Sequence, residues 1–173
     1  MGETPLAVSN IIRSLYMILW VPILALSATA NTLVSNTIGA GKQNEVISLI
    51  WKIARLSLGI GVGIVLILGL FPTFALQIYT SDLALIEKSI PSLYVILFVL
   101  LVLSVGNVFF QAVSGTGNTK SALLIELATL AAYCVWMWVM VIRLQAPLAV
   151  CWSSELIYAV FIAHFFYSFF VIA

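Results

Sequence analysis

Two carboxylates, Glu126 and Glu155, each stand alone in an apolar run that carries no other charged residue. Trp152 and Tyr158 lie three residues to either side of Glu155, which places all three side chains on one face of a helix. A carboxylate beside aromatic rings attracts organic cations through its charge and through cation–π contacts. Glu155 is therefore a candidate for holding a positively charged ligand.

Each carboxylate also has a structural explanation. Glu126 lies about one and a half helical turns after Lys120, so the two side chains could pair at a membrane surface. This position favours the structural role for Glu126. For Glu155 the functional and the structural explanation remain balanced.

Further polar and aromatic side chains recur every three or four residues, which arranges them in stripes along single helix faces. The members of these stripes are Ser27, Asn31 and Ser35; Ser104, Asn107, Gln111 and Ser114; Glu126, Thr129, Tyr133 and Trp136; and Trp152, Glu155 and Tyr158. Such stripes could converge on a common cavity, or they could join neighbouring helices by hydrogen bonds. For the first two stripes both explanations stay open.

The sequence argues against several other kinds of chemistry. It contains no His-Glu-x-x-His or Gly-x-Ser-x-Gly motif and no Cys/His cluster with metal spacing, so we expect neither an enzyme nor a bound cofactor. The net charge of +1 offers no basic patch that would bind nucleic acid. The two cysteines, Cys134 and Cys151, are expected to be small packing residues.

The elements that carry these residues are five long apolar runs. Hydrophobic residues make up 64% of the 173 residues, charged residues make up 8%, and the mean hydropathy is +1.22. A helix of about 20 apolar residues crosses a bilayer, and continuous runs favour helices over barrel strands. We therefore predict an all-α, polytopic transmembrane helix bundle that contacts the lipid bilayer and forms a single membrane domain over residues 1–173. Its five spans are predicted at about 10–39, 46–80, 91–113, 120–143 and 147–172.

Prolines and glycines refine this picture. Pro22 is expected to kink the first span, and Pro91 and Pro147 are expected to begin the third and fifth spans. Gly59 and Gly63 have the spacing of a close helix–helix contact, and Gly61 adds to the same surface of small residues. Short connections make successive spans antiparallel, so the two glycine-rich loops should lie on one side of the membrane. Lys and Arg residues weakly favour the cytoplasm for that side.

Two motifs in those loops resemble the multidrug and toxic compound extrusion (MATE) family of transporters. The run Ala30–Lys42 ends in Gly-Ala-Gly-Lys and is similar to a turn that ends a helix in that family. The run Gln111–Lys120 is similar to the family's second glycine loop, usually written around Gly-x-Gly-Asp-Thr, although Asn118 replaces the acid here.

The resemblance implies a fold and a partner. MATE transporters have twelve helices in two lobes and exchange a substrate held between the lobes for Na⁺ or H⁺. The five spans would correspond to the last five helices, so the chain resembles a carboxy-terminal-lobe fragment that lacks the amino-terminal lobe. Some members carry a coupling carboxylate on the helix that matches the third span. This chain has no acidic residue between Lys88 and Lys120.

We therefore expect part of a secondary-active antiporter in the cell membrane, in bacteria the inner membrane, that exports amphipathic organic cations and drugs in exchange for Na⁺ or H⁺. The expected cavity takes charge from Glu126 and Glu155, hydrogen bonds from Asn31, Asn107 and Gln111, and aromatic faces from Tyr133, Trp136, Trp152 and Tyr158. Two alternatives stay open: a lipid-linked saccharide flippase of the same superfamily, and a non-transporting, truncated membrane protein.

Overall fold

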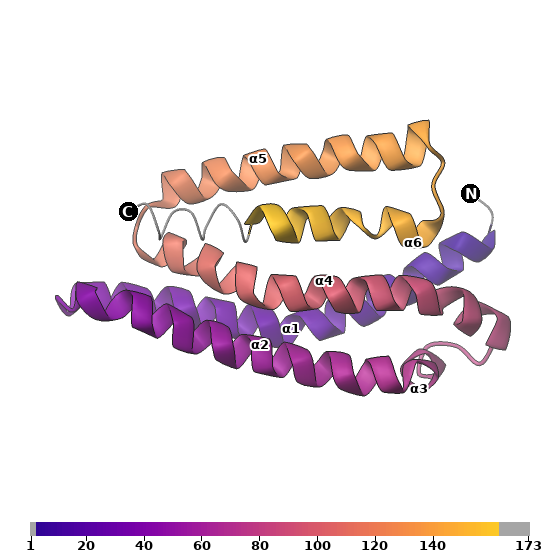
Figure 1. Ribbon diagram of the computed structural model, residues 1–173, viewed down its shortest axis with the longest axis horizontal. Helices are drawn as coiled ribbons and strands as arrows, with labels where there is room; N and C mark the ends of the chain where they lie inside the picture. The colour runs from indigo at the N-terminus through magenta and orange to yellow at the C-terminus, as the bar shows by residue number, and fades with distance from the viewer. Residues whose placement is uncertain (1–2, 163–173) are drawn as a thin grey trace.

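The computed structural model describes residues 3–162, and its regular elements within that range are all helices. The long helices lie side by side along the molecule (Figure 1). The elements are α1 (Glu3–Gly39), a 3₁₀ turn (Gln43–Glu45), α2 (Val46–Leu70), α3 (Pro72–Gln77), α4 (Leu83–Gly115), α5 (Thr119–Trp138), a π-helical turn (Val139–Arg143) and α6 (Leu148–Cys151). Residues 154–162 continue as helix after a short turn that follows α6.

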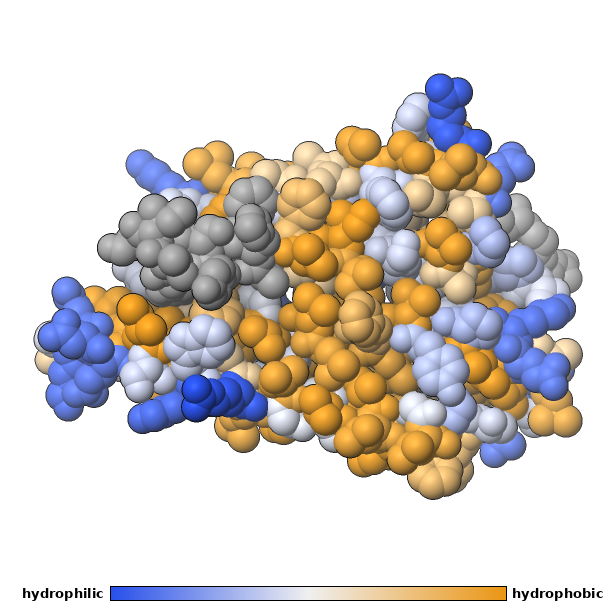
Figure 2. Space-filling model, in the orientation of Figure 1, coloured by the Kyte–Doolittle hydropathy of each residue, from blue (hydrophilic) through white to orange (hydrophobic). Residues whose placement is uncertain are grey.

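The prediction of an all-α membrane bundle is confirmed for the described residues. Four helices there are long and apolar enough to cross a bilayer, namely Thr4–Gly39, Gln43–Leu70, Leu83–Gly115 and Thr119–Arg143. The fifth predicted span begins as the shorter apolar helix Leu148–Ile162, and its remainder, 163–172, lies outside the described residues. Figure 2 shows a broad hydrophobic band across the middle of one face, with hydrophilic residues gathered toward the ends of the molecule.

The first helix begins earlier than predicted, at Glu3 and not near residue 10. Its added turns are anchored because Val8 and Ile12 pack into a buried cluster with Leu93 and Leu97 of α4. Burial of this apolar face stabilises the first turns of the helix, which hydropathy alone did not predict. Pro22 lies inside the continuous α1.

The second predicted span, 46–80, is wrong at its carboxyl end. α2 ends at Leu70, and α3 begins at Pro72 after a break at Phe71, whose φ and ψ are −126° and 56°. Proline removes a backbone donor and disfavours the helical conformation of the residue before it. The apolar run therefore continues past the point where the helix stops.

The prediction that Pro91 begins the third span is also wrong. α4 begins at Leu83, where the Asp82 side chain accepts a hydrogen bond of 2.9 Å from the Ala84 amide. Such a cap satisfies one of the free amides at a helix start. Buried Ile86 and Ser89 then hold the helix against its neighbours, and Pro91 lies inside it on the exposed side.

Helix α4 is the central element, because buried residues line it from Ile86 to Gly115 and pack against α1 and α2. The predicted contact at Gly59 and Gly63 is not formed, since a Cβ on either residue would meet no atom within 4 Å. Gly61 makes the close approach of α2, where a Cβ would lie 3.3 Å from Ser104 Cβ. Small residues thus do bring α2 and α4 together, through Gly61, which lies two residues from each member of the predicted pair.

The two glycine loops lie at the same end of the bundle, as predicted (Figure 1). Gly41 and Gly117 adopt φ of 76° and 85°, in the left-handed region that glycine accepts without a Cβ clash. The Asn118 side chain then caps α5 by accepting a hydrogen bond from the Ser121 amide. At the other end, Pro147 immediately precedes α6, in agreement with its predicted place at a helix start.

Candidate cation site

Glu155 lies where the helix of residues 154–162 faces both α1 and α5. Its Oε2 accepts a hydrogen bond of 3.2 Å from the Tyr16 hydroxyl of α1. Its Oε1 accepts a longer hydrogen bond, 3.4 Å, from the Tyr133 hydroxyl of α5. The first helix and the last two long helical segments described therefore meet at one carboxylate.

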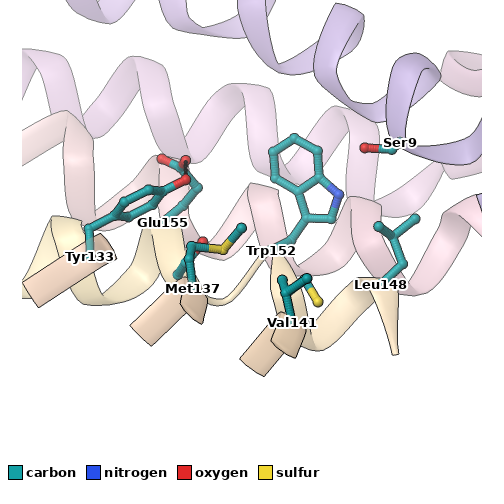
Figure 3. A pocket seen from close by; sticks show the side chains of 9 residues that line it. Ser9, Tyr133, Met137, Val141, Leu148, Trp152 and Glu155 are labelled. Atoms are coloured by element: carbon teal, nitrogen blue, oxygen red, sulfur yellow. Dashed lines mark hydrogen bonds between the residues drawn. The ribbon is translucent and has the colours of Figure 1, made fainter. Parts of the chain in front are cut away.

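Two cavities adjoin this carboxylate. One has a volume of about 310 Å³ and is lined by Ser9, Tyr133, Met137, Val141, Leu148, Cys151, Trp152, Ser154 and Glu155. The other has a volume of about 370 Å³ and is lined by Arg13, Tyr16, Met17, Trp20, Tyr133, Trp152 and Glu155. Figure 3 shows the Trp152 indole lying along the first cavity between Glu155 and Ser9.

Aromatic rings form the walls around Glu155. The Tyr16 ring lies 5.9 Å from the Trp20 ring and meets the Trp152 ring edge-on at 6.2 Å, measured between ring centroids. Among residues 3–162, the ion pair that is found joins Lys42 and Glu45. Glu155 therefore has two tyrosine hydroxyls as its partners there, and no cationic side chain. A carboxylate held this way presents negative charge and aromatic faces together, which suits an organic cation.

The second carboxylate, Glu126, lies outside the lining of these two cavities. Its Oε1 accepts a hydrogen bond of 2.8 Å from the Tyr158 hydroxyl, and its buried Oε2 has no hydrogen-bond partner among the described residues. Among the described residues, Glu126 and Lys120 do not form the ion pair that their spacing allowed. Glu126 and Tyr158 thus form a separate polar contact between α5 and the helix of residues 154–162.

The predicted polar stripe of α1 serves mainly to join α1 to α4. The Asn31 amide donates a hydrogen bond of 3.2 Å to Gln111 Oε1, and Ser35 donates one of 2.9 Å to the Gly115 carbonyl. The helices approach so closely that a Cβ on Gly115 would lie 2.6 Å from the Asn31 carbonyl oxygen. Of the two explanations for this stripe, the contacts match the hydrogen-bonded helix interface.

The remaining predicted residues lie apart from these contacts. Asn107 is buried within α4 at 6% exposure. The Trp136 indole nitrogen and the Thr129 hydroxyl on α5 are buried without a hydrogen-bond partner in the described part of the chain. Of the nine predicted site residues, the structure therefore brings Tyr133, Trp152 and Glu155 together at the cavities.

Sequence reasoning missed the contribution of α1 to these cavities, which comes from Arg13, Tyr16 and Trp20. A signal was present, because Trp20 lies seven residues before Ser27 and Tyr16 a further four, which extends the same helix face. In an apolar helix, however, an aromatic residue looks like ordinary packing. Its role became visible only when Glu155 was placed opposite.

The described residues hold no group of three or more His, Cys, Asp or Glu side chains arranged for a metal ion. Both cysteines are free thiols; Cys134 is exposed on α5, and Cys151 is buried beside the first cavity. The site is thus built from a carboxylate, phenols and indoles.

Comparison with protein families gave a match to the MatE family model over residues 1–139. The matched region contains both glycine-loop motifs and the residues of α1 and α5 that contact Glu155, whereas Glu155 itself follows it. Comparisons with curated proteins and with solved structures gave no match.

Proposed function

Because this chain belongs to the MatE family of membrane transporters, we propose that it forms part of a secondary-active antiporter for amphipathic organic cations. In this proposal the substrate cation sits beside Glu155 and is exchanged for Na⁺ or H⁺ as the transporter changes conformation. A second lobe would close the cavities from the opposite side, since alternating access generally requires one helical unit to move against another.

The observation that carries this proposal is the setting of Glu155. Its carboxylate adjoins both cavities and is held by the Tyr16 and Tyr133 hydroxyls without an ion pair among the described residues. A charged group inside a membrane protein costs free energy, so it persists where it has hydrogen bonds and a function. The tyrosines supply the hydrogen bonds and leave the negative charge available to a ligand.

The shape and lining of the cavities support a ligand of moderate size. Volumes of about 310 and 370 Å³ lie at the lower end of small-molecule pockets, which span about 300–1,000 Å³. Apolar groups such as Met137 and Leu148 line the first cavity beside Trp152. These surfaces would cover the hydrophobic body of an amphipathic cation while Glu155 attracts its charge.

Export of a fluorescent cationic dye such as ethidium tests the proposal. The protein is expressed together with an amino-terminal MATE lobe in cells that lack other efflux pumps, and dye accumulation is measured. Glu155→Gln removes the charge and keeps the size of the side chain, so we expect dye to accumulate as in cells without the transporter. Glu87→Gln is the matched control, because Glu87 is an exposed carboxylate on α4 that lines neither cavity. Equal export by wild type and Glu155→Gln at equal membrane abundance would remove Glu155 from the proposed site.

A further inference from the structure

The first turns of α2 carry a small basic patch on the outer surface of the bundle. Lys52 and Arg55 are three residues apart and both are exposed, and the exposed Ser48 lies one turn before Lys52. Residues at these spacings share one helix face. Figure 2 shows hydrophilic side chains over this part of α2, beside a hydrophobic surface that continues along the helix. Together Ser48, Lys52 and Arg55 form the α2 patch.

The charge of the α2 patch is not balanced by acidic residues of the same helix. No Asp or Glu occurs between Glu45 and Asp82, and Glu45 lies 3.9 Å from the Lys42 ammonium in an ion pair. Like charges three or four residues apart on one helix face repel each other and destabilise the helix. An anion shared by Lys52 and Arg55 would offset this repulsion, whereas a single exposed basic side chain needs only water.

The α2 patch lies where the membrane-depth part of α2 begins. Arg55 is the last charged residue of the helix, because the stretch Leu56–Leu70 carries none. Trp51 lies one turn before Arg55, is 43% exposed, and packs edge-on against Phe109 at 5.3 Å between ring centroids. Tryptophan is enriched where a membrane helix leaves the hydrocarbon core. The two basic side chains therefore lie at the level of the lipid headgroups.

The same helix face is flat just inside this level. Gly59 follows Arg55 by four residues, and Gly63 follows Gly59 by four. A Cβ on either glycine would meet no atom within 4 Å, so no side chain of the described residues fills the space over them. The exposed Val62 and Leu66 continue the face as apolar surface. A lipid whose headgroup contacts Arg55 thus has room for an acyl chain along this face.

We propose that the α2 patch binds a phospholipid whose headgroup carries a net negative charge. Lys52 and Arg55 bind the phosphate, for which the guanidinium offers parallel hydrogen bonds, and Ser48 donates a hydrogen bond to the outer part of the headgroup. A zwitterionic phospholipid brings its own cationic group to this place, whereas phosphatidylglycerol does not, so charge complementarity favours the anionic lipid. No residue of α2 lines the two cavities beside Glu155, and the lipid site is separate from the proposed cation site.

Native mass spectrometry of the purified, delipidated protein tests this proposal. Phosphatidylglycerol and phosphatidylcholine with the same acyl chains are added separately, and the dissociation constant of the first bound lipid is measured for each. The wild type should bind the first phosphatidylglycerol about tenfold or more tightly than the first phosphatidylcholine. Lys52→Gln/Arg55→Gln should reduce this preference to about twofold or less and leave the affinity for phosphatidylcholine unchanged, which also shows that the variant is folded.

Two further variants separate the patch from general surface charge. Lys42→Gln/Lys120→Gln is the matched control, because it removes two exposed lysines at the same end of the bundle and outside the α2 patch. It should keep the preference for phosphatidylglycerol. Lys52→Arg/Arg55→Lys exchanges the two cations without changing their total charge, and it should also keep the preference.

Several results would overturn the proposal. These are equal binding of the two lipids by the wild type, an unchanged preference in Lys52→Gln/Arg55→Gln, a lost preference in the exchanged variant, and an equal loss in the matched control. The last result would indicate general attraction to surface charge. An excess of soluble glycerol phosphate should not displace the first phosphatidylglycerol. Displacement would assign the α2 patch to a free phosphate and would likewise overturn the lipid site.

Discussion

The hydroxyl of Tyr16 donates a hydrogen bond of 3.2 Å to the carboxylate of Glu155, which joins the first helix to the last described one across 139 residues of sequence. This contact brings α1 to the cavities and gives the carboxylate a fixed direction. The proposed chemistry depends on that pairing, because a charged group without hydrogen bonds is costly inside a membrane protein.

The first prediction concerns the strength of that contact. Tyr16→Phe should destabilise the protein by about 1 kcal/mol, because it removes one hydrogen bond to a charged group in a membrane setting. In a Glu155→Met background the same change should cost almost nothing, since methionine offers the Tyr16 hydroxyl no comparable acceptor. Unfolding in mixed detergent micelles measures both effects. Equal costs in the two backgrounds would mean that the hydroxyl acts elsewhere.

The second prediction concerns the close approach of α1 and α4. Gly115→Ala would place a Cβ 2.6 Å from the backbone oxygen of Asn31, which has no flexible end that can move aside. We expect a loss of about 1–3 kcal/mol in stability, the usual cost of overpacking. Gly63→Ala is the matched control, since a Cβ there meets nothing within 4 Å and should stabilise α2 by about 0.5–1 kcal/mol. A tolerated Gly115→Ala would show that the helices lie further apart.

The third prediction concerns access of water and ligand to the first cavity. Cys151 lines that cavity, and Cys134 is exposed on α5. In a Cys134→Ser variant, a small water-soluble methanethiosulfonate reagent should modify Cys151, and a saturating organic cation should slow the reaction severalfold. The rate is followed by mass spectrometry.

The Cys151→Ser variant provides the comparison for this labelling experiment, because Cys134 lies outside the lining of both cavities. Its modification should be insensitive to the cation. Labelling of Cys151 at the same rate with and without the cation would place the ligand somewhere else.

The sequence predicted the class of fold well because lipid demands long apolar helices, and the described ones occur where the apolar runs occur. It predicted helix ends less well. The apolar run around Pro72 was predicted as one span, because hydropathy does not register the backbone donor that proline lacks. Pro91 was predicted as a helix start, but α4 begins earlier, at the cap that Asp82 forms. Local backbone chemistry decides these ends, and an apolar average conceals it.

The candidate site was predicted in part, and the reason is again physical. Spacing shows which residues share a helix face, but it does not show which helix lies opposite, because in lipid the outer surface is as apolar as the core. Asn31 and Glu155 therefore looked like members of one cavity, whereas Asn31 pairs with Gln111 and Glu155 with Tyr16. The partner of a polar stripe becomes known only with the packing of the bundle.

The central claim is that the carboxylate of Glu155 holds an organic cation. Its most direct test is equilibrium binding of benzyltrimethylammonium, which carries a permanent charge and donates no N–H or O–H hydrogen bonds, to the purified protein in nanodiscs by calorimetry. We expect Glu155→Gln to weaken binding about tenfold or more, while Glu126→Gln, at a carboxylate outside both cavities, stays within about twofold of wild type. Binding by Glu155→Gln that is as tight as that of wild type would contradict the account.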